Sequence, residues 1–266
     1  MKQTGDGSGF VFLEAFDLTG KVAIFVGGSG GLGKTISLGL AKAGANVIPV
    51  SRSKQRNEEV VKEIEASGVQ SLLTTVDVTR EEEVQRLVEE VMSKFGRIDI
   101  LINAAGINYK KPVIELTVAE WDHVIAVNLK GTFLCCKLVG EKMLAQNYGK
   151  IVNIASLGSH LGITRSAAYC ASKGAVLQLT KVLAAEWASH GINVNCISPG
   201  YFKTALNEKM LSEKETYDKI MNRTPMQRLG VPEDLVGATV FLCSDAAKFI
   251  TGTTIEVDGG FLSMAL

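Results

Sequence analysis

Short, wholly apolar runs alternate with helical stretches along most of this chain of 266 residues. The first run, Val22–Val26, ends in glycines, and Leu32, Ile36 and Leu40 then recur at the spacing of one helix face. Apolar runs of this length are typical of strands buried on both faces. Strands that alternate with helices in this way predict a parallel sheet with helices on both faces.

The alternation continues to the C-terminal part of the chain without a linker-like stretch, a low-complexity segment or an internal repeat. We therefore expect a single doubly wound, Rossmann-like α/β domain over residues 1–266. Seven strands are expected, at 22–26, 46–50, 71–76, 98–102, 151–155, 193–198 and 253–257. Helices are expected at 31–43, 54–66, 81–95, 121–146, 167–189 and 232–243. The polar start, 1–15, is expected to be a loose leader, and 201–224 a lid over the substrate.

The composition argues against several classes of protein. Basic and acidic residues balance at 28 each, so no positive excess exists to attract nucleic acid. The chain shows no apolar stretch of about 20 residues and no signal-peptide pattern, so neither a membrane span nor secretion is expected. The five cysteines are scattered and odd in number, which indicates reduced thiols in a cytoplasmic protein. No histidine or cysteine spacing predicts a metal site.

A glycine-rich string, from Gly27 to Gly33, separates the first expected strand from the first expected helix. A helix N-terminus offers free N–H groups and partial positive charge, and glycines let the backbone approach a pyrophosphate closely. Glycine-rich loops are common, but a position directly after a buried strand is the one that dinucleotide-binding folds use. The expected cofactor contacts in this turn are Gly27, Ser29, Gly31, Leu32 and Gly33.

The end of the second expected strand indicates which dinucleotide binds. A carboxylate there would favour NAD, but the strand is followed by Ser51 and Arg52. A guanidinium forms planar, charge-assisted hydrogen bonds with a phosphate, and the serine hydroxyl adds a small donor. We therefore expect both residues to contact NADP, with NAD as the alternative if Arg52 is only a solvated loop residue.

Tyr169 and Lys173 stand four residues apart at the start of an expected helix and so share one face. An ammonium beside a phenol favours the phenolate and lowers the tyrosine pKa from its ordinary value of about 10. Such a tyrosine could exchange a proton with a substrate oxygen near neutral pH. By themselves, two such residues are more often an ordinary surface pair, so the interpretation depends on their neighbours.

Those neighbouring motifs, taken together, resemble the short-chain dehydrogenase/reductase family from Leu18 to Phe261. The matching residues are Gly27, Gly31 and Gly33; Asp77-Val78; Asn103-Ala104-Ala105-Gly106; Asn128; Ser156; Tyr169 with Lys173; Pro199-Gly200 with Thr204; and Val257-Asp258-Gly259-Gly260. The chain departs from the family at Val26, where most relatives have a threonine.

The resemblance implies an oxidoreductase that moves a hydride between a nicotinamide and a substrate alcohol or carbonyl. It makes Tyr169 the general acid/base and Ser156 a hydrogen-bond partner of the reacting oxygen. Lys173 would lower the tyrosine pKa and hold the nicotinamide ribose, and Asn128 would hold a water that links Lys173 to solvent. The further cofactor contacts that it implies are Asp77, Val78, Asn103, Ala104, Gly106, Tyr169, Lys173, Pro199, Gly200 and Thr204. The family usually forms homotetramers through its two long central helices, here 121–146 and 167–189.

Within the family, the likeness is to gluconate 5-dehydrogenases and similar sugar-acid dehydrogenases. The expected substrate contacts are Ser156, Ser159, Tyr169 and Tyr201. Further candidates are Asn108 and His160 for a polyol, and Lys110, Lys111 and Arg165 for a carboxylate, although a plain solvated role is the more common one. The alternatives are a 3-oxoacyl-carrier-protein reductase and a non-catalytic dinucleotide-binding sensor or structural protein.

Overall fold

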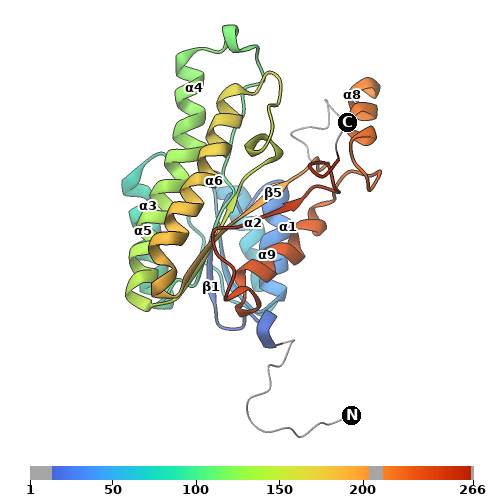
Figure 1. The fold of residues 1–266 in the computed structure, drawn as a ribbon. Coiled ribbons are helices and arrows are strands. Elements are labelled where there is room, and N and C mark those ends of the chain that lie inside the picture. The colour runs from blue at the N-terminus through green and yellow to red at the C-terminus, as the bar shows by residue number, and fades with distance from the viewer. Residues whose placement is uncertain (1–13, 204–211, 265–266) are drawn as a thin grey trace, which may run out of the picture.

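A parallel sheet of six strands runs through the middle of the protein in the order β2-β1-β3-β4-β5-β6 (Figure 1). The computed structural model describes residues 14–203 and 212–264. The strands are β1 (Val22–Val26), β2 (Asn46–Val50), β3 (Ile100–Asn103), β4 (Gly149–Ile154), β5 (Ile192–Pro199) and β6 (Thr254–Val257). Because β2 and β3 lie on opposite sides of β1, the order of the strands reverses at β1, which is where open α/β sheets bind their ligands.

One of the seven expected strands, residues 71–76, does not form a strand, so the prediction of seven strands was wrong by this one. The segment still lies along the outer edge of β2, where the Ser71 hydroxyl donates to the Val47 carbonyl at 2.6 Å. Asn46 donates its N–H toward β1, and successive residues of a strand alternate sides, so Pro49 faces the outer edge. Since proline has no N–H, a regular ladder cannot form in the middle of that edge.

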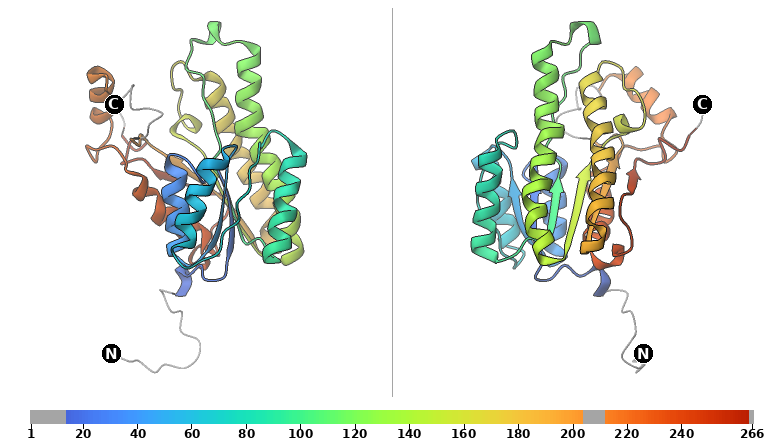
Figure 2. Two further views of the ribbon diagram at one scale, coloured as in Figure 1. Left: turned by 180° about the vertical axis from the view of Figure 1, so that it is seen from behind. Right: turned by 60° about the vertical axis from the view of Figure 1, so that its left-hand side comes forward.

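Two layers of helices cover the sheet (Figures 1 and 2). One layer is α1 (Leu32–Lys42), α2 (Lys54–Glu65) and α9 (Val236–Cys243); the other is α3 (Glu81–Phe95), α5 (Gly131–Gln146) and α6 (Ala167–Trp187). The fully buried strand β1 shows why both layers are needed, because Ile24 packs into the core beneath α3 and α5, while Phe25 packs into the core beneath α1 and α9. The doubly wound arrangement expected from the apolar runs is thereby confirmed.

Local signals in the sequence set several helix boundaries. The helix α4 (Val118–Ile125) begins at a capping box in which Thr117 and Glu120 bond each other's backbone N–H groups. It continues through a π-helical turn, Ala126–Lys130, into α5. A last helix, α8 (Lys214–Asn222), lies beyond the carboxyl edge of the sheet (Figure 1).

The continuous helix Val118–Gln146 is long and apolar enough to cross a membrane by those two criteria alone, with a mean hydropathy of 1.2 in its most apolar window. Half of that window is buried inside the protein, and the core helix of a globular fold passes the same test. Of the expected leader, residues 1–13 lie outside the described residues, whereas Glu14–Phe16 forms a 3-10 turn in which Ala15 is buried.

Candidate active site

The glycine-rich turn joins β1 to α1 at the carboxyl edge of the sheet. Gly27 and Gly31 have φ values of +88° and +49°, which residues with a side chain rarely adopt. A Cβ atom on Gly33 would lie 2.1 Å from the Gly27 carbonyl oxygen, so the helix can pack this closely only with glycine there. Among the described residues no side chain caps α1, which begins at Leu32, so its free N–H groups are available to a phosphate. The turn therefore fits a pyrophosphate.

Three polar side chains connect this turn to the end of β2. The Ser29 hydroxyl donates to Ser51 Oγ at 2.8 Å, and the Ser51 hydroxyl donates to Asn57 Oδ1 at 2.6 Å. Asn57 is fully buried, and its Nδ2 donates to the Thr74 carbonyl at 2.6 Å. The two serines that were expected to contact the cofactor are therefore fixed relative to each other.

Two guanidinium groups lie at this end of the turn. Arg52 is exposed directly after Ser51. Arg56, in the first turn of α2, has its Nη1 3.5 Å from the position of a Cβ atom on Gly30. Arg56 was not predicted from the sequence, although its place in the first turn of the helix that follows Arg52 could have signalled it. Together the two arginines provide positive charge for a group with the charge of a phosphate.

Asp77 and Val78, two of the expected cofactor contacts, precede α3. Burial alone would raise the pKa of Asp77, but hydrogen bonds from Thr79 and the charges of Arg52 and Arg80 outweigh it, so the pKa is lowered. Both the N–H and the hydroxyl of Thr79 donate to Asp77 Oδ1, at 3.0 and 2.7 Å. Val78 is buried. The carboxylate is therefore ionised and fixed in orientation.

The chain leaving β3 runs against the glycine-rich turn, where a Cβ atom on Gly27 would lie 2.9 Å from the Ala104 carbonyl carbon. At the end of β3, Asn103 Nδ2 donates to Asn153 Oδ1 at 2.9 Å. Asn103 Oδ1 is buried and has no partner among the described residues. A buried amide oxygen without a donor is costly, so this atom is suited to receive a hydrogen bond from a ligand. Gly106 follows, and a Cβ atom on it would lie 3.5 Å from Asn128 Oδ1 and 3.7 Å from Lys173 Nζ.

Asn128 lies inside the π-helical turn between α4 and α5 and is fully buried. Its Oδ1 accepts from the Ile107 N–H at 2.8 Å, and its Nδ2 donates to the Ile107 carbonyl at 3.0 Å and to Ser172 Oγ at 3.0 Å. Ser172 in turn donates to the Tyr169 carbonyl at 2.7 Å. The asparagine therefore ties the segment after β3 to α6. π-Helical turns inside α-helices often occur at functional sites.

Ser156 follows β4, and Tyr169 lies in the first turn of α6, near enough for the serine hydroxyl to influence the pKa of the phenol. Ser156 Oγ also accepts from the Gly158 N–H at 3.1 Å, which fixes the hydroxyl. Burial raises the pKa of Tyr169, the hydrogen bond with Ser156 acts in the opposite direction, and nearby Cys170 adds to the rise.

Lys173 lies one helical turn after the tyrosine, only 4% exposed, with its Nζ 6.0 Å from the centre of the Tyr169 ring. Its ammonium donates to the Ile154 carbonyl at 2.6 Å. Burial lowers the pKa of Lys173 to about 8. Burial is the largest cause of both pKa shifts, and the ammonium points at a backbone carbonyl, so the expectation that this lysine lowers the tyrosine pKa stays a prediction.

The chain after β5 approaches the end of β6. A Cβ atom on Gly200 would lie 2.6 Å from the Asp258 Cα atom, so Pro199 and Gly200 are held against that loop. Tyr201 packs its ring edge-on against Phe261, with 5.4 Å between ring centres. The expected contact Thr204 lies outside the described residues.

Two of the expected polar substrate candidates have unpaired atoms. Among the described residues, Ser159 Oγ and Asn108 Oδ1 are buried without a hydrogen-bond partner. The Asn108 amide is fixed by its Nδ2, which donates to Ser166 Oγ at 3.1 Å. His160 instead lies beside the Ser198 hydroxyl, with 2.9 Å between Nε2 and Oγ. The two unpaired atoms are thus available to a polyol.

The basic residues expected as candidates for a carboxylate are Lys110, Lys111 and Arg165. Lys111 is engaged in an ion pair with Glu120 at 2.5 Å. Arg165 is exposed on a residue with φ of +64°. Within the described part of the chain, no group of three metal-ligating side chains is present.

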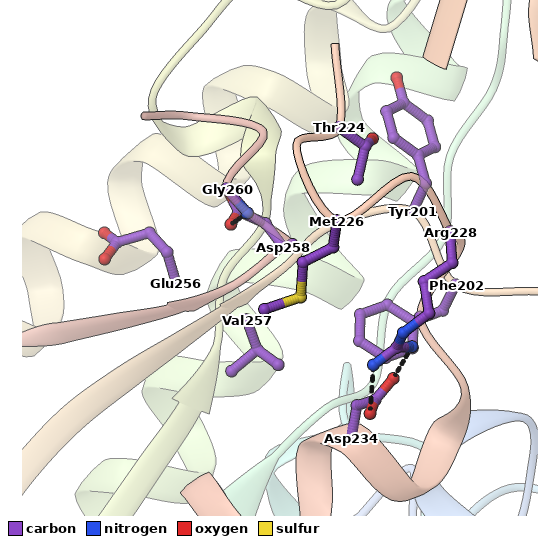
Figure 3. A pocket seen from close by; sticks show the side chains of 12 residues that line it. Tyr201, Phe202, Thr224, Met226, Arg228, Asp234, Glu256, Val257, Asp258 and Gly260 are labelled. Atoms are coloured by element: carbon purple, nitrogen blue, oxygen red, sulfur yellow. Dashed lines mark hydrogen bonds and ion pairs between the residues drawn. The ribbon is translucent and has the colours of Figure 1, made fainter. Parts of the chain in front are cut away.

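A cavity of about 330 Å³ opens between the loop after β5 and the end of β6 (Figure 3). Tyr201 and Thr224 lie at one side of it, and the Arg228 guanidinium faces the Asp234 carboxylate at the other (Figure 3). The four expected catalytic residues do not line it. Of the residues expected to contact the substrate, only Tyr201 lines this cavity. Proton transfer is therefore assigned to the group around Tyr169 and not to the cavity.

A family model described as enoyl-(acyl carrier protein) reductase matches residues 27–262, which covers the turn, the Ser156 and Tyr169 elements and the C-terminal strand. The chain belongs to the short-chain dehydrogenase/reductase family. Membership of this family confirms the resemblance drawn from the motifs, and with it an enzyme rather than a non-catalytic sensor.

Members of the family with assigned activities are similar over nearly the whole chain. The 2-dehydro-3-deoxy-D-gluconate 5-dehydrogenase of Dickeya dadantii is 39% identical over 95% of this chain and 100% of its own. The 3-oxoacyl-(acyl-carrier-protein) reductase of Staphylococcus epidermidis is 39% identical over 90% of this chain and 98% of its own. The crystal structure of a gluconate 5-dehydrogenase from Burkholderia cenocepacia, in complex with NADP and tartrate, superimposes with a TM-score of 0.92 at 36% identity, covering 95% and 99% of the two chains.

Proposed function

We propose that this enzyme transfers a hydride between NADP(H) and a secondary alcohol or carbonyl of a sugar acid such as gluconate or 5-ketogluconate. The observation that carries the proposal is the placement of Ser156, Tyr169, Lys173 and Asn128 at the end of β4, the start of α6 and the π-helical turn, where hydrogen bonds fix Asn128 and Lys173 to neighbouring groups. The sugar-acid substrate is supported by the names of relatives that match nearly the full chain.

The residues divide the work of moving a proton. The Tyr169 phenol gives a proton to the substrate oxygen in reduction and takes it back in oxidation, and the Ser156 hydroxyl holds that oxygen in place. Lys173, buried beside the phenol, holds the ribose and stabilises the phenolate when its ammonium turns toward the ring. Asn128 fixes the backbone at Ile107 and so orients α6. The nicotinamide, when bound, supplies or accepts the hydride.

The preference for NADP rests on the positive charge at the end of β2. Arg52 and Arg56 would flank a 2′-phosphate, with the Ser29 and Ser51 hydroxyls as additional partners. The remaining cofactor contacts proposed are those named from the motifs, from Gly27 to Gly200, with Thr204. NADP is bound in several crystal structures of relatives that match this chain.

The experiment that tests the proposal is a screen of sugar acids, polyols and an acetoacetyl thioester, each with NADP(H) and NAD(H), on wild-type enzyme and Tyr169→Phe. The sugar acids should turn over with NADP(H), and Tyr169→Phe, which keeps the ring but has no proton to give, should lose turnover while it still binds cofactor. Turnover of the thioester instead would favour the reductase of acyl carrier protein, which relatives of similar identity represent.

We further propose a cytoplasmic homotetramer assembled through the outer faces of α5 and α6. The apolar side chains Phe133 and Val182 are 43% and 51% exposed on these two helices, which supports a contact there. The reduced state of the cysteines, four of which are buried, fits a cytoplasmic location. Sedimentation of Val182→Glu against wild type tests the contact: smaller particles are expected, and an unchanged particle size would contradict it.

A further inference from the structure

Arg223 directly follows α8 and contacts Phe261, which lies just after β6. Its Cζ atom is 4.7 Å from the centre of the Phe261 ring. Tyr201, directly after the Pro199-Gly200 pair, packs edge-on against the same ring. Phe261 is therefore held between a guanidinium and a phenol, which fixes the plane of the arginine head.

The charge of Arg223 is not matched by an acid. Its Nε is buried without a hydrogen-bond partner, and no carboxylate among the described residues pairs with it. By contrast, Arg86, Arg97 and Arg228 each form an ion pair with an aspartate or glutamate. A buried donor of a cationic group is costly unless an acceptor reaches it. Arg223 is thus an arginine with a buried donor that lacks an acceptor.

The position of this arginine connects it with the catalytic helix. Tyr201 lies two residues after β5, and Ile197 in that strand pairs with Ile154 at the end of β4, two residues before Ser156. Cys170 is the neighbour of Tyr169 in α6, and a Cβ atom on Gly158, in the loop after Ser156, would lie 3.0 Å from its Sγ. The guanidinium and Tyr201 therefore lie at the same carboxyl edge of the sheet as Ser156 and Tyr169.

We propose that Arg223 binds the carboxylate of the substrate and thereby selects sugar acids over uncharged polyols. A guanidinium offers two parallel N–H donors that match a carboxylate, which no lysine can do. The inference rests on the proposed function and names the residue that reads the acid group.

The test compares oxidation of gluconate with that of gluconamide, which keeps the hydroxyls and lacks the charge. In Arg223→Met, the ratio of kcat/KM for the acid to that for the amide should fall about 10- to 100-fold, as expected for a lost charge-assisted contact. Arg223→Lys, which keeps the charge and loses the paired donors, should give a ratio between those of wild type and Arg223→Met. Arg86→Met, the same change at an exposed ion-paired arginine, should leave the ratio unchanged.

The outcomes separate the two proposals. Wild-type enzyme that oxidises neither compound overturns the proposed function, and this inference with it. Wild-type enzyme that prefers the acid, with Arg223→Met or Arg223→Lys showing the same preference, overturns only the role of Arg223. If Arg223→Met does not fold, Arg223→Lys and titration calorimetry of gluconate on both folded proteins decide the question.

Discussion

Gly33→Ala should destabilise the protein, although alanine in a helix interior normally stabilises it by about 1 kcal/mol relative to glycine. The added Cβ atom would lie 2.1 Å from the Gly27 carbonyl oxygen, about 1.3 Å short of an ordinary contact of 3.4 Å, and 3.0 Å from the Gly28 Cα atom. Both obstructing atoms belong to the backbone and cannot rotate away. Forced overpacking of this kind costs up to about 3 kcal/mol, so a net loss of about 2 kcal/mol is expected.

A matched control is available in α9, where Gly237 is exposed and a Cβ atom would meet nothing within 4 Å. Gly237→Ala should therefore stabilise the protein by about 0.5–1 kcal/mol. Urea denaturation followed by circular dichroism, at one protein concentration, measures both variants, and a titration with NADP should show at least about tenfold weaker binding to Gly33→Ala. If Gly33→Ala proved as stable as Gly237→Ala, the turn would not be as tightly packed as described.

Three further predictions follow from the site. Asn128→Ala leaves the buried Ile107 N–H and carbonyl without partners, and urea denaturation should show a loss of about 2–4 kcal/mol; a loss below about 1 kcal/mol would mean that these groups find other partners. Arg52→Ala and Arg56→Ala should each weaken NADP binding about 10-fold or more in fluorescence titrations and leave NAD binding nearly unchanged; equal effects on both cofactors would argue against a 2′-phosphate site. Burial lowers the pKa of Lys173 in the folded protein from 10.5 to about 8, so between these pH values the unfolded chain binds one more proton than the folded chain. Wild type should therefore gain stability relative to Lys173→Met as the pH rises from 8 to 10.5, by up to about 3 kcal/mol. A stability difference that does not change with pH over this range, measured by urea denaturation, would contradict the burial of the ammonium.

The layers of the fold could be predicted because they depend on local patterns. The apolar runs and the helical spacings identify which residues are buried, and six of the seven expected strands form where the runs lie. The segment 71–76 was predicted as a strand because its own residues suit one. The residue that prevents regular pairing, Pro49, lies on the neighbouring strand β2. A pairing that a partner strand prevents cannot be seen in the sequence of the segment itself.

Spacing could predict that Tyr169 and Lys173 lie near each other, but not the electrostatics of the pair. Spacing places Lys173 beside Tyr169, and the structure keeps them 6.0 Å apart, measured from Nζ to the ring centre. The sign of the tyrosine pKa shift depends on burial by other elements, which no local pattern reports. For the same reason Arg223 was passed over, since its need for a partner is visible only once its surroundings are known.

The ammonium of Lys173 has three N–H donors and, within the described residues, one hydrogen-bond acceptor, the Ile154 carbonyl. A Cβ atom on Gly106 would lie 3.7 Å from its Nζ, so the glycine leaves space on that side of the ammonium. Ribose hydroxyls that entered this space would accept hydrogen bonds from the remaining N–H donors and stabilise the charged form of the lysine. Burial causes the low pKa of Lys173, and hydrogen bonds to a bound dinucleotide would offset that effect, so binding should raise the pKa and give the ammonium a greater influence on Tyr169.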